Sequence, residues 1–389
     1  MGVSITPWSV VIAPLRAWLF VSFASMLNFT VIDYIVWGIF ILERIYYIQR
    51  PWLKQRSIER THSTEAEANP EGISLVLCIY NEVQHLQKYL ESWISIDYPN
   101  LELIIINDGS EDNSLDIIHQ LTQGCSNIRV HTIDHQGKKK ALETGIQKAA
   151  FPCIALTDID CYPNSNQWLH IMAKYFKRRG CLIGFAPYHY EKHSLLNGLM
   201  QFDTKLLGED YLKTASQGKA YMGTGRNMML WKPDYIDWKA KYSNKLATGD
   251  DDLFIQYCAK NNRCDVVLDS RSWVYSSPPT SIRQYIQRKS RHQQSGRIYP
   301  LRIQVRLFLL NLPTLMYSWA LFLSFLSWSI PVIFMLSTLI HYLGSGGNLV
   351  RPRNTNKFLN FVLGRWCYGI IFPYSILRTF WTDKRKWLG

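Results

Sequence analysis

Acidic residues follow two short apolar segments in the middle of the chain, where strands of a sheet are expected to end. Asp108 follows residues 101–107, and Asp158 and Asp160 follow residues 153–157. Parallel strands end at one edge of a sheet, so we expect these side chains to lie close together. An Asp-x-Asp pair supplies two hard oxygen ligands, which suit Mg²⁺ or Mn²⁺ with phosphate oxygens completing the shell. Strand-end aspartates also cap turns, but acids at successive strand ends favour a site.

Three adjacent carboxylates lie further along the chain, in Thr248-Gly-Asp-Asp-Asp-Leu253. Neighbouring carboxylates repel one another, which raises the pKa of one of them toward a range that is useful for proton transfer. Acidic side chains also suit the N-terminus of a helix, where they cap N–H groups and interact with the macrodipole. The segment therefore predicts either a catalytic carboxylate or the start of a helix.

The segments around these residues alternate between strand-like and helix-like patterns. Short, nearly continuous apolar runs are typical of buried parallel strands, and amphipathic stretches follow them. The expected strands are 73–80, 101–107, 128–133 and 153–157, and the expected helices are 83–94, 114–121 and 139–150. This alternation predicts an α/β fold with a doubly wound sheet, whose site lies at the carboxyl ends of the strands.

The net charge of +13 is unevenly distributed along the chain. Residues 1–270 contain 27 Lys and Arg against 29 Asp and Glu, whereas residues 270–382 contain thirteen basic residues and no acidic one. The basic excess therefore falls where the long apolar runs lie. Basic residues that flank apolar runs are typical of the cytoplasmic side of a membrane rather than of a nucleic-acid site, so we expect no nucleic-acid partner.

Two apolar regions predict membrane segments. Residues 307–350 contain no charged side chain, and these 44 residues are enough for two crossings joined by a tight turn. Residues 17–42 are interrupted only by Asp33, and basic residues follow them, which predicts one crossing into the cytoplasm. The expected organisation is a membrane segment over 1–47, a linker over 48–71, a cytoplasmic domain over 72–300, a transmembrane hairpin over 301–350, and an interfacial or membrane helix with a basic tail over 351–389.

Six motifs of the middle domain resemble, in order, those of inverting family 2 glycosyltransferases, particularly the membrane-bound, cellulose-synthase-like and bacterial members. The motifs are Tyr80-Asn-Glu82, Asn107-Asp-Gly-Ser110, Gly137-Lys-Lys-Lys-Ala-Leu142, Thr157-Asp-Ile-Asp-Cys161, Gly223-Thr-Gly-Arg-Asn227 and Thr248-Gly-Asp-Asp-Asp-Leu253. The resemblance spans about residues 72–300. It implies the GT-A fold, the nucleotide-diphospho-sugar transferase type, with membrane helices at both ends.

The resemblance also implies how a nucleotide-sugar donor binds. Asp108 would accept a hydrogen bond from uracil, and Asp158 and Asp160 would bind the diphosphate through a divalent Mg or Mn ion that stabilises the departing UDP. Further donor-binding residues would be Tyr80, Asn81, Glu82, Lys138 and Lys139. By itself the lysine run would predict a solvated loop.

The acceptor side of the site follows from the same resemblance. An inverting displacement needs a general base for the acceptor hydroxyl, and the register assigns that role to Asp250, with Asp251 as the second candidate. Asn227 would bind the acceptor sugar, although its motif also fits a strand-to-loop turn. Gly249 stands where the commoner family motif has glutamate, so the contact of that glutamate is not carried over.

The C-terminal motif departs from the family pattern. Processive members carry Gln-x-x-Arg-Trp, whereas this chain has Gln287-Arg-Lys-Ser-Arg-His292. Arg291 takes the arginine position and can bind a diphosphate, His292 replaces the Trp, and Arg288 falls where the Gln belongs. The missing Trp favours transfer of one sugar over export of a polymer. The basic stretch 282–306 also suits an interfacial helix on anionic lipid.

The function that we expect is that of a multi-pass enzyme of the cell (inner) membrane with a cytoplasmic catalytic domain. It would transfer a sugar, from UDP by resemblance, to a lipid-linked or membrane-proximal glycan during synthesis of cell-envelope polysaccharide or glycolipid. Two alternatives stay open. A catalytically silent membrane scaffold of the same fold would have lost the acids, and a nucleotidyltransferase would carry a Gly-rich loop after the first strand.

Overall fold

The computed structural model describes residues 34, 38, 70–191, 194–242, 250–324 and 355–379 of the chain. The chain divides into two compact units, one formed by residues 1–51 with 309–346 and the other by 52–308 with 347–389. The second unit contains all the strands that the described residues form. The predicted membrane segment over 1–47 and the linker over 48–71 lie almost entirely outside the described residues, as does the predicted hairpin from residue 325 on.

A seven-stranded sheet organises the second unit, in the order β3-β2-β1-β4-β7-β6-β8. Its strands are β1 (Ile73–Ile79), β2 (Leu101–Asp108), β3 (Ile128–Ile133), β4 (Cys153–Leu156), β6 (Cys181–Ile183), β7 (Met228–Trp231) and β8 (Cys264–Val266). The first four are parallel, as their patterns predict, whereas β7 runs antiparallel to β4 and β6. The sheet is therefore mixed rather than wholly parallel.

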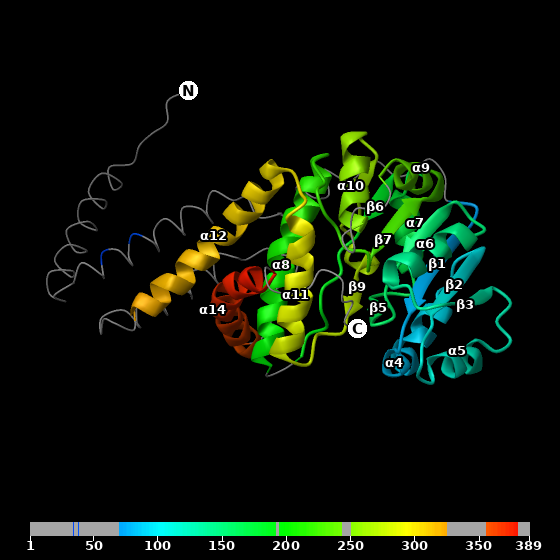
Figure 1. The fold of residues 1–389 in the computed structure, drawn as a ribbon, viewed down its shortest axis with the longest axis horizontal. Helices are drawn as coiled ribbons and strands as arrows, with labels where there is room; N and C mark the ends of the chain where they lie inside the picture. Colours follow the sequence, from blue (N-terminus) through cyan, green and yellow to red (C-terminus); the bar gives the residue numbers. More distant parts are fainter. Residues whose placement is uncertain are drawn as a thin grey trace, which may run out of the picture. The chain divides into compact units, whose positions relative to one another are not determined.

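Helices cover both faces of this sheet (Figure 1). The helices of one face are α4 (Val83–Ile94), α5 (Ser114–Thr122) and α7 (Trp168–Tyr175), and those of the other are α6 (Lys138–Lys148), α9 (Lys232–Tyr242) and α10 (Asp250–Lys260). Alternate residues of each strand serve the two faces, since Val76 packs into one core and Leu75 and Leu77 into the other. Burial on both faces explains the nearly continuous apolar sequence of β1 and β2.

A small second sheet lies directly after the Asp-x-Asp pair. β5 (Cys161–Pro163) pairs antiparallel with β9 (Val274–Ser276), which follows the short helix η1 (Ser270–Ser272). The backbone N–H of Ser277 also donates to the carbonyl of Asp160, at 2.8 Å. The end of β9 therefore fixes the backbone on which the second aspartate of the pair is carried.

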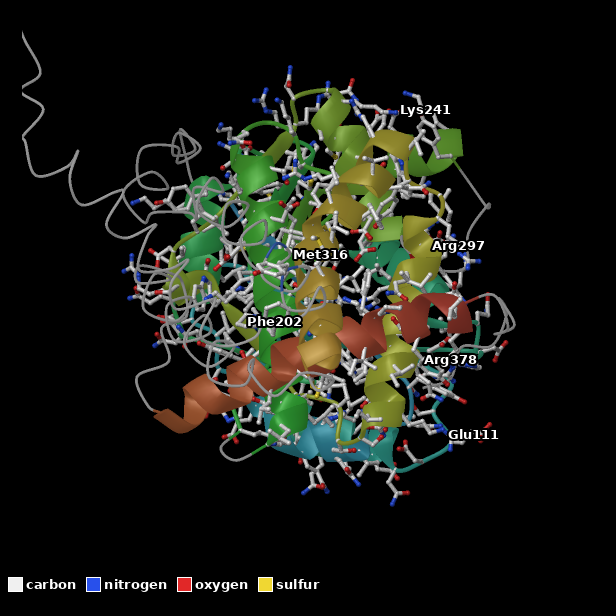
Figure 2. All side chains as sticks on the ribbon, turned by 90° about the vertical axis from the view of Figure 1, so that its left-hand side faces the viewer. Glu111, Phe202, Lys241, Arg297, Met316 and Arg378 are labelled. Atoms are coloured by element: carbon white, nitrogen blue, oxygen red, sulfur yellow. The ribbon has the colours of Figure 1, made fainter. Side chains whose placement is uncertain are left out.

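Three helices pack together beside the main sheet: α8 (Leu195–Ser216), α11 (Ile282–Gly296) and α14 (Thr355–Arg378). The closest approach is at Gly364, where an added Cβ would lie 2.3 Å from the backbone of Gly198. Figure 2 shows α14 crossing α8 near Phe202, whose ring centroid lies 5.5 Å from that of Tyr368. α12 (Leu301–Ser324) begins shortly after α11.

Within the described ranges, no helix combines the length and the apolar character that a membrane crossing needs. This includes α12, over which the first part of a hairpin is predicted, and α14, for which an interfacial or membrane helix is predicted.

Candidate active site

The predicted donor-binding residues meet at one edge of the main sheet. β1, β2 and β4 are parallel neighbours, so the residues that follow them share the carboxyl-terminal edge. These are the turn of residues 80–82, Asp108, and the pair Asp158 and Asp160. The strand-end argument from the sequence therefore agrees with the topology of the chain.

Asp108 is buried and holds the segment that leads into α6. Its two carboxylate oxygens accept hydrogen bonds from the backbone N–H groups of Gln136 and Gly137, each at 2.9 Å. Nδ1 of His135 lies 3.0 Å from the same carboxylate, and the His135 ring stacks on Tyr80 with centroids 4.0 Å apart. Oδ1, which accepts from the Gln136 N–H, keeps a further lone pair, so Asp108 combines a structural role with the capacity to accept a donor N–H.

The turn of residues 80–82 joins β1 to α4 and is hydrogen-bonded to the segment that follows β2. Asn81 has a positive φ of 54°, and its side-chain oxygen accepts from the backbone N–H of Glu111 at 2.8 Å. Glu82 contacts His85 at 2.5 Å, and this hydrogen bond raises the pKa of His85. The turn is thus held by its polar side chains, while the rings of Tyr80 and His135 form a flat surface beside Asp108.

The Asp-x-Asp pair is surrounded by cationic side chains. Nζ of Lys138 lies 2.6 Å from Oδ1 of Asp158, and Nη2 of Arg288 lies 3.4 Å from Oδ2 of Asp160. Withdrawal from water opposes ionisation of Asp160, but the guanidinium groups of Arg288 and Arg226 lower the pKa of its carboxyl. Asp160 is therefore available as an anionic ligand at physiological pH.

These residues fit a divalent ion. Among the described residues, no group of three or more His, Cys, Asp or Glu side chains is arranged to hold a metal. Two carboxylates are nevertheless a sufficient protein share for Mg²⁺ or Mn²⁺, which takes its other ligands from phosphate and water. Lys138 and Arg288 now supply positive charge where such an ion would lie, and their side chains remain partly exposed and free to turn toward phosphate oxygens.

The acidic segment 250–252 forms the start of α10, as one of its two sequence interpretations predicts. Oδ2 of Asp251 accepts from the N–H of Gly225 at 3.2 Å, and Oδ1 of Asp252 accepts from the N–H of Gly223 at 3.2 Å. Burial raises the pKa of Asp251, while Lys138 acts in the opposite direction. The segment is thus electrostatically coupled to the donor edge. The side chain of Asp250 lies outside the described residues.

Asn227 does not lie where an acceptor-binding residue must lie. It is fully buried, its amide nitrogen donates to the carbonyls of Phe185 and Ser272, and its oxygen accepts from the Trp168 indole. The prediction of a sugar contact is wrong for this residue because both ends of its amide serve the core. Arg226, its neighbour, faces the site instead and donates to Ser276 Oγ at 2.6 Å.

The remaining predicted residues lie on α6 and α11. Lys139 is half-buried on α6, next to Lys138, which makes the ion pair with Asp158. On α11, Arg288 contacts the Asp-x-Asp pair, Arg291 is half-buried one turn later, and His292 is exposed. The donor-side position of α11 agrees with the sequence, but the direct contact comes from Arg288, at the position where the family has Gln.

Several residues of this region are not apparent from the sequence. The Tyr299 hydroxyl donates to Asp252, Lys289 pairs with Asp203, and Arg306 pairs with Asp210. Their partners lie 47 to 96 residues apart in the chain, so no local pattern links them. The only available signal is the presence of Asp203 and Asp210 in an otherwise buried helix, seven residues apart.

Parts of the chain that include this site are similar to known proteins. Residues 74–236 match the family described as Glycosyl transferase family 2. Over 121 residues the chain is 36% identical to a poly-beta-1,6-N-acetyl-D-glucosamine synthase of Staphylococcus epidermidis, covering 31% of this chain and 29% of that protein. Over 90 residues it is 34% identical to the synthase of Staphylococcus aureus strain COL, covering 23% and 22%. The chain therefore matches less than a third of the length of these relatives.

A solved structure supports the fold. A mannosyltransferase from Pyrobaculum calidifontis in complex with GDP-Man and Mn²⁺ is similar with a TM-score of 0.55 and 14% identity, covering 89% of this chain and 99% of that one. At this identity the likeness concerns the fold alone, and it confirms the GT-A-like α/β architecture that the motifs predict. Residues 74–236, which match the glycosyltransferase family 2 model, include Asp108, Asp158 and Asp160, so the candidate donor edge lies within the matched part of the chain.

Proposed function

We propose that the protein transfers a sugar from a nucleotide-diphosphate sugar, with UDP as the nucleotide, to a lipid-linked or membrane-proximal glycan acceptor. The product would be a cell-envelope polysaccharide or glycolipid. The observation that carries this proposal is the cluster of Asp158, Asp160, Lys138 and Arg288 at the edge of the sheet. Carboxylates and cations that neutralise one another at a partly exposed edge suit a ligand that brings both a metal ion and a diphosphate.

The nucleotide would lie over the ends of β1 and β2. The stacked rings of Tyr80 and His135 provide an aromatic face for a base, and Oδ1 of Asp108 keeps a lone pair for a base N–H. A divalent ion on Asp158 and Asp160, when bound, would neutralise charge that develops on the departing diphosphate. Lys138 and Arg288 would then donate to the phosphate oxygens rather than to the aspartates.

The transfer itself would be a single displacement with inversion. The acceptor hydroxyl oxygen forms a bond to the anomeric carbon, while the bond from that carbon to the diphosphate oxygen breaks and its electron pair leaves with the nucleoside diphosphate. The proton of the hydroxyl passes to a carboxylate of the segment 250–252. Asp250 remains the predicted base, and Asp251 is the second candidate. The Asp251 carboxylate accepts from the N–H of Gly225, and the charge of Lys138 acts to lower its pKa.

We also propose that the protein works at the cell membrane, with the catalytic domain in the cytoplasm. Leu301, Val305 and Phe308 are exposed at 74%, 47% and 55% of their surface and form one stripe of α12 by their spacing. No acidic residue lies between positions 270 and 382, so this basic stretch of the chain is attracted to anionic lipid. Full-length protein should float with anionic vesicles, and replacing Leu301 and Phe308 with Glu should reduce flotation. Equal flotation of both proteins would contradict the role of this stripe.

A donor panel tests the enzymatic proposal. Solubilised full-length protein, native membrane lipid and MnCl₂ are incubated with UDP-N-acetylglucosamine, UDP-glucose, UDP-galactose or GDP-mannose, and release of nucleoside diphosphate is measured. We expect release with one UDP-sugar and none from Asp158→Asn. Release from GDP-mannose alone would refute the choice of nucleotide. Release from none of them, together with no binding of UDP and MnCl₂, would favour the silent scaffold.

A further inference from the structure

Helix α8 carries a buried aspartate that receives two donors from α11. Nζ of Lys289 lies 2.5 Å from Oδ1 of Asp203, and the Tyr285 hydroxyl donates to Oδ2 at 2.8 Å. The side chains of Lys289 and Asp203 are only 7% and 9% exposed. Tyr285 and Lys289 are four residues apart, so both project from one face of α11. This face is therefore attached to α8 at a single carboxylate.

Helix α14 completes the enclosure of Lys289. The ammonium group lies 5.1 Å from the centroid of the Tyr368 ring and 5.6 Å from that of Phe372. The hydroxyl of Ser290 donates to the backbone carbonyl of Ser375 at 3.0 Å. Lys289 thus has a carboxylate on α8 and aromatic faces on α14, which together define both the rotation of α11 and its position along its axis.

The residue before Lys289 is the arginine of the donor edge. Consecutive residues of an α-helix point about 100° apart, so fixing Lys289 toward α8 fixes the direction of Arg288. Arg288 contacts Asp160, and Arg291 follows it by three residues on the same side of the helix. The ion pair of Lys289 and Asp203 therefore holds α11 in the rotation at which Arg288 contacts Asp160.

We infer that Asp203 and Lys289 are positioning residues that hold α11 in the rotation at which Arg288 meets the donor diphosphate. This inference deepens the proposed function and rests on it. Stability alone does not account for such a pair, because a buried ion pair is often no more stabilising than apolar residues of the same size. Its specific contribution is directional, since a single carboxylate with two donors tolerates little rotation of α11.

The test separates position from stability. In full-length protein, Lys289→Met leaves Asp203 buried without its cation, and the double variant Asp203→Asn with Lys289→Met removes both charges. Binding of UDP with MnCl₂ is measured by calorimetry, and thermal midpoints are recorded for each protein. We expect Lys289→Met to lose both stability and affinity. The double variant should regain most of its midpoint and still bind UDP about tenfold more weakly, because the charge-assisted contact of Arg288 stays misaligned.

Arg306→Met is the matched control. Arg306 pairs with Asp210, seven residues along α8 from Asp203, and contacts that carboxylate at 2.9 and 2.7 Å. The Arg306→Met substitution should lower the thermal midpoint and leave the affinity for UDP within about twofold of that of the unaltered protein. If affinity returns together with stability in the double variant, or falls equally in Arg306→Met, the pair is structural only and the inference is wrong.

Hydrogen exchange distinguishes this outcome from failure of the proposed function. If the unaltered protein binds no UDP with MnCl₂, the donor proposal fails. The positioning of α11 can still be measured by hydrogen exchange of its own amides. Amides of residues 282–296 should then exchange faster in the double variant than in the unaltered protein, with those of β1 and β2 unchanged. Equal exchange over 282–296 would overturn the inference independently of any ligand.

Discussion

Two groups of charged pairs among the described residues differ in the exposure of their carboxylates. At the edge of the sheet, Lys138 and Asp158 contact each other with 45% and 26% of their side chains exposed. Along α8, both members of the pair of Lys289 and Asp203 are almost completely enclosed, and Asp210 is 1% exposed although its partner Arg306 is 43% exposed. The partly exposed carboxylate of the first group can exchange its partner for a ligand at little cost, whereas a carboxylate enclosed on α8 that loses its cation stays buried without compensation.

This difference in exposure gives the two groups different roles at the site. A diphosphate and a metal ion must displace the contacts that hold Asp158 and Asp160 before they bind, so those contacts need to be weak. The helix that carries Arg288 must meanwhile stay in place, so its attachment to α8 needs to be strong and directional. The partly exposed ion pair therefore lies at the edge of the sheet, and the enclosed ion pair lies on the helix that supports Arg288.

The largest expected effect concerns the acidic segment of α10, which faces the exchangeable group. Asp250→Asn should lower the transfer rate at saturating donor by about 10²–10⁴, the usual cost of losing a positioned base. Donor affinity should change little, because this carboxylate is predicted to touch the acceptor. Asp251→Asn should be milder. Reversal of this order would assign the base to Asp251, and full activity of both variants would refute the catalytic role of the segment.

The next effect concerns the Asp-x-Asp pair itself. Asp158→Ala and Asp160→Ala should each weaken metal-dependent UDP binding by more than about 100-fold, since loss of residues that merely support metal ligands typically costs 10–100-fold. A chelator should reproduce the effect in the unaltered protein. Calorimetry that finds the same UDP affinity with and without chelator would exclude a metal between donor and aspartates.

A third prediction compares the two groups of pairs directly. Arg306→Met should lower the free energy of unfolding by about 3–5 kcal/mol, because it leaves the buried carboxylate of Asp210 without its cation. Lys138→Met breaks a partly exposed pair and should cost at most about 1 kcal/mol. Denaturant unfolding of the two variants checks the difference. Equal losses would mean that exposure does not separate the two groups.

Sequence reasoning succeeds on the edge and fails on α8 for one physical reason. Asp108, Asp158 and Asp160 follow strands whose parallel order is readable from local patterns, so their meeting point follows from topology. Asp203 is buried in a helix, and its partner Lys289 comes 86 residues later. Nothing within one helix indicates which distant cation will neutralise it.

Asn227 illustrates a second reason for failure. A motif reports that a residue type is required at a position, but it does not report whether the requirement is chemical or structural. Within Gly223-Thr-Gly-Arg-Asn227, the side chain of Arg226 is directed to the site and that of Asn227 to the core. The side-chain amide of Asn227 forms hydrogen bonds with two backbone carbonyls and an indole N–H, and each of these buried groups would be costly to leave without a partner. The motif therefore does not distinguish a side chain that faces the site from one that is bound within the core.

The smallest expected effect concerns Asp252, an acid that differs from the ion-paired acids at the sheet edge and on α8 because its described partners are uncharged. Its described partners are the Tyr299 hydroxyl and the Gly223 N–H, both uncharged. Burial and the neighbouring Asp251 raise the pKa of Asp252 well above its usual value. A carboxyl whose pKa is higher in the folded than in the unfolded state binds its proton more tightly when folded. Its stabilising contribution is therefore complete below the unfolded pKa and is lost as the pH rises through the folded pKa.

Asp252→Asn removes this titration while it keeps an oxygen that can accept from Gly223. We expect the thermal midpoint of the unaltered protein to fall, relative to that of Asp252→Asn, as the pH rises from about 4 to 8, with the variant equal or more stable at the upper end. Midpoints recorded across this range in one buffer system check the sign. A variant that becomes relatively less stable as the pH rises would mean that Asp252 is stabilised as the anion. Asp252 would then resemble the ion-paired acids of α8, and the uncharged partners Tyr299 and Gly223 would be sufficient to stabilise a buried carboxylate.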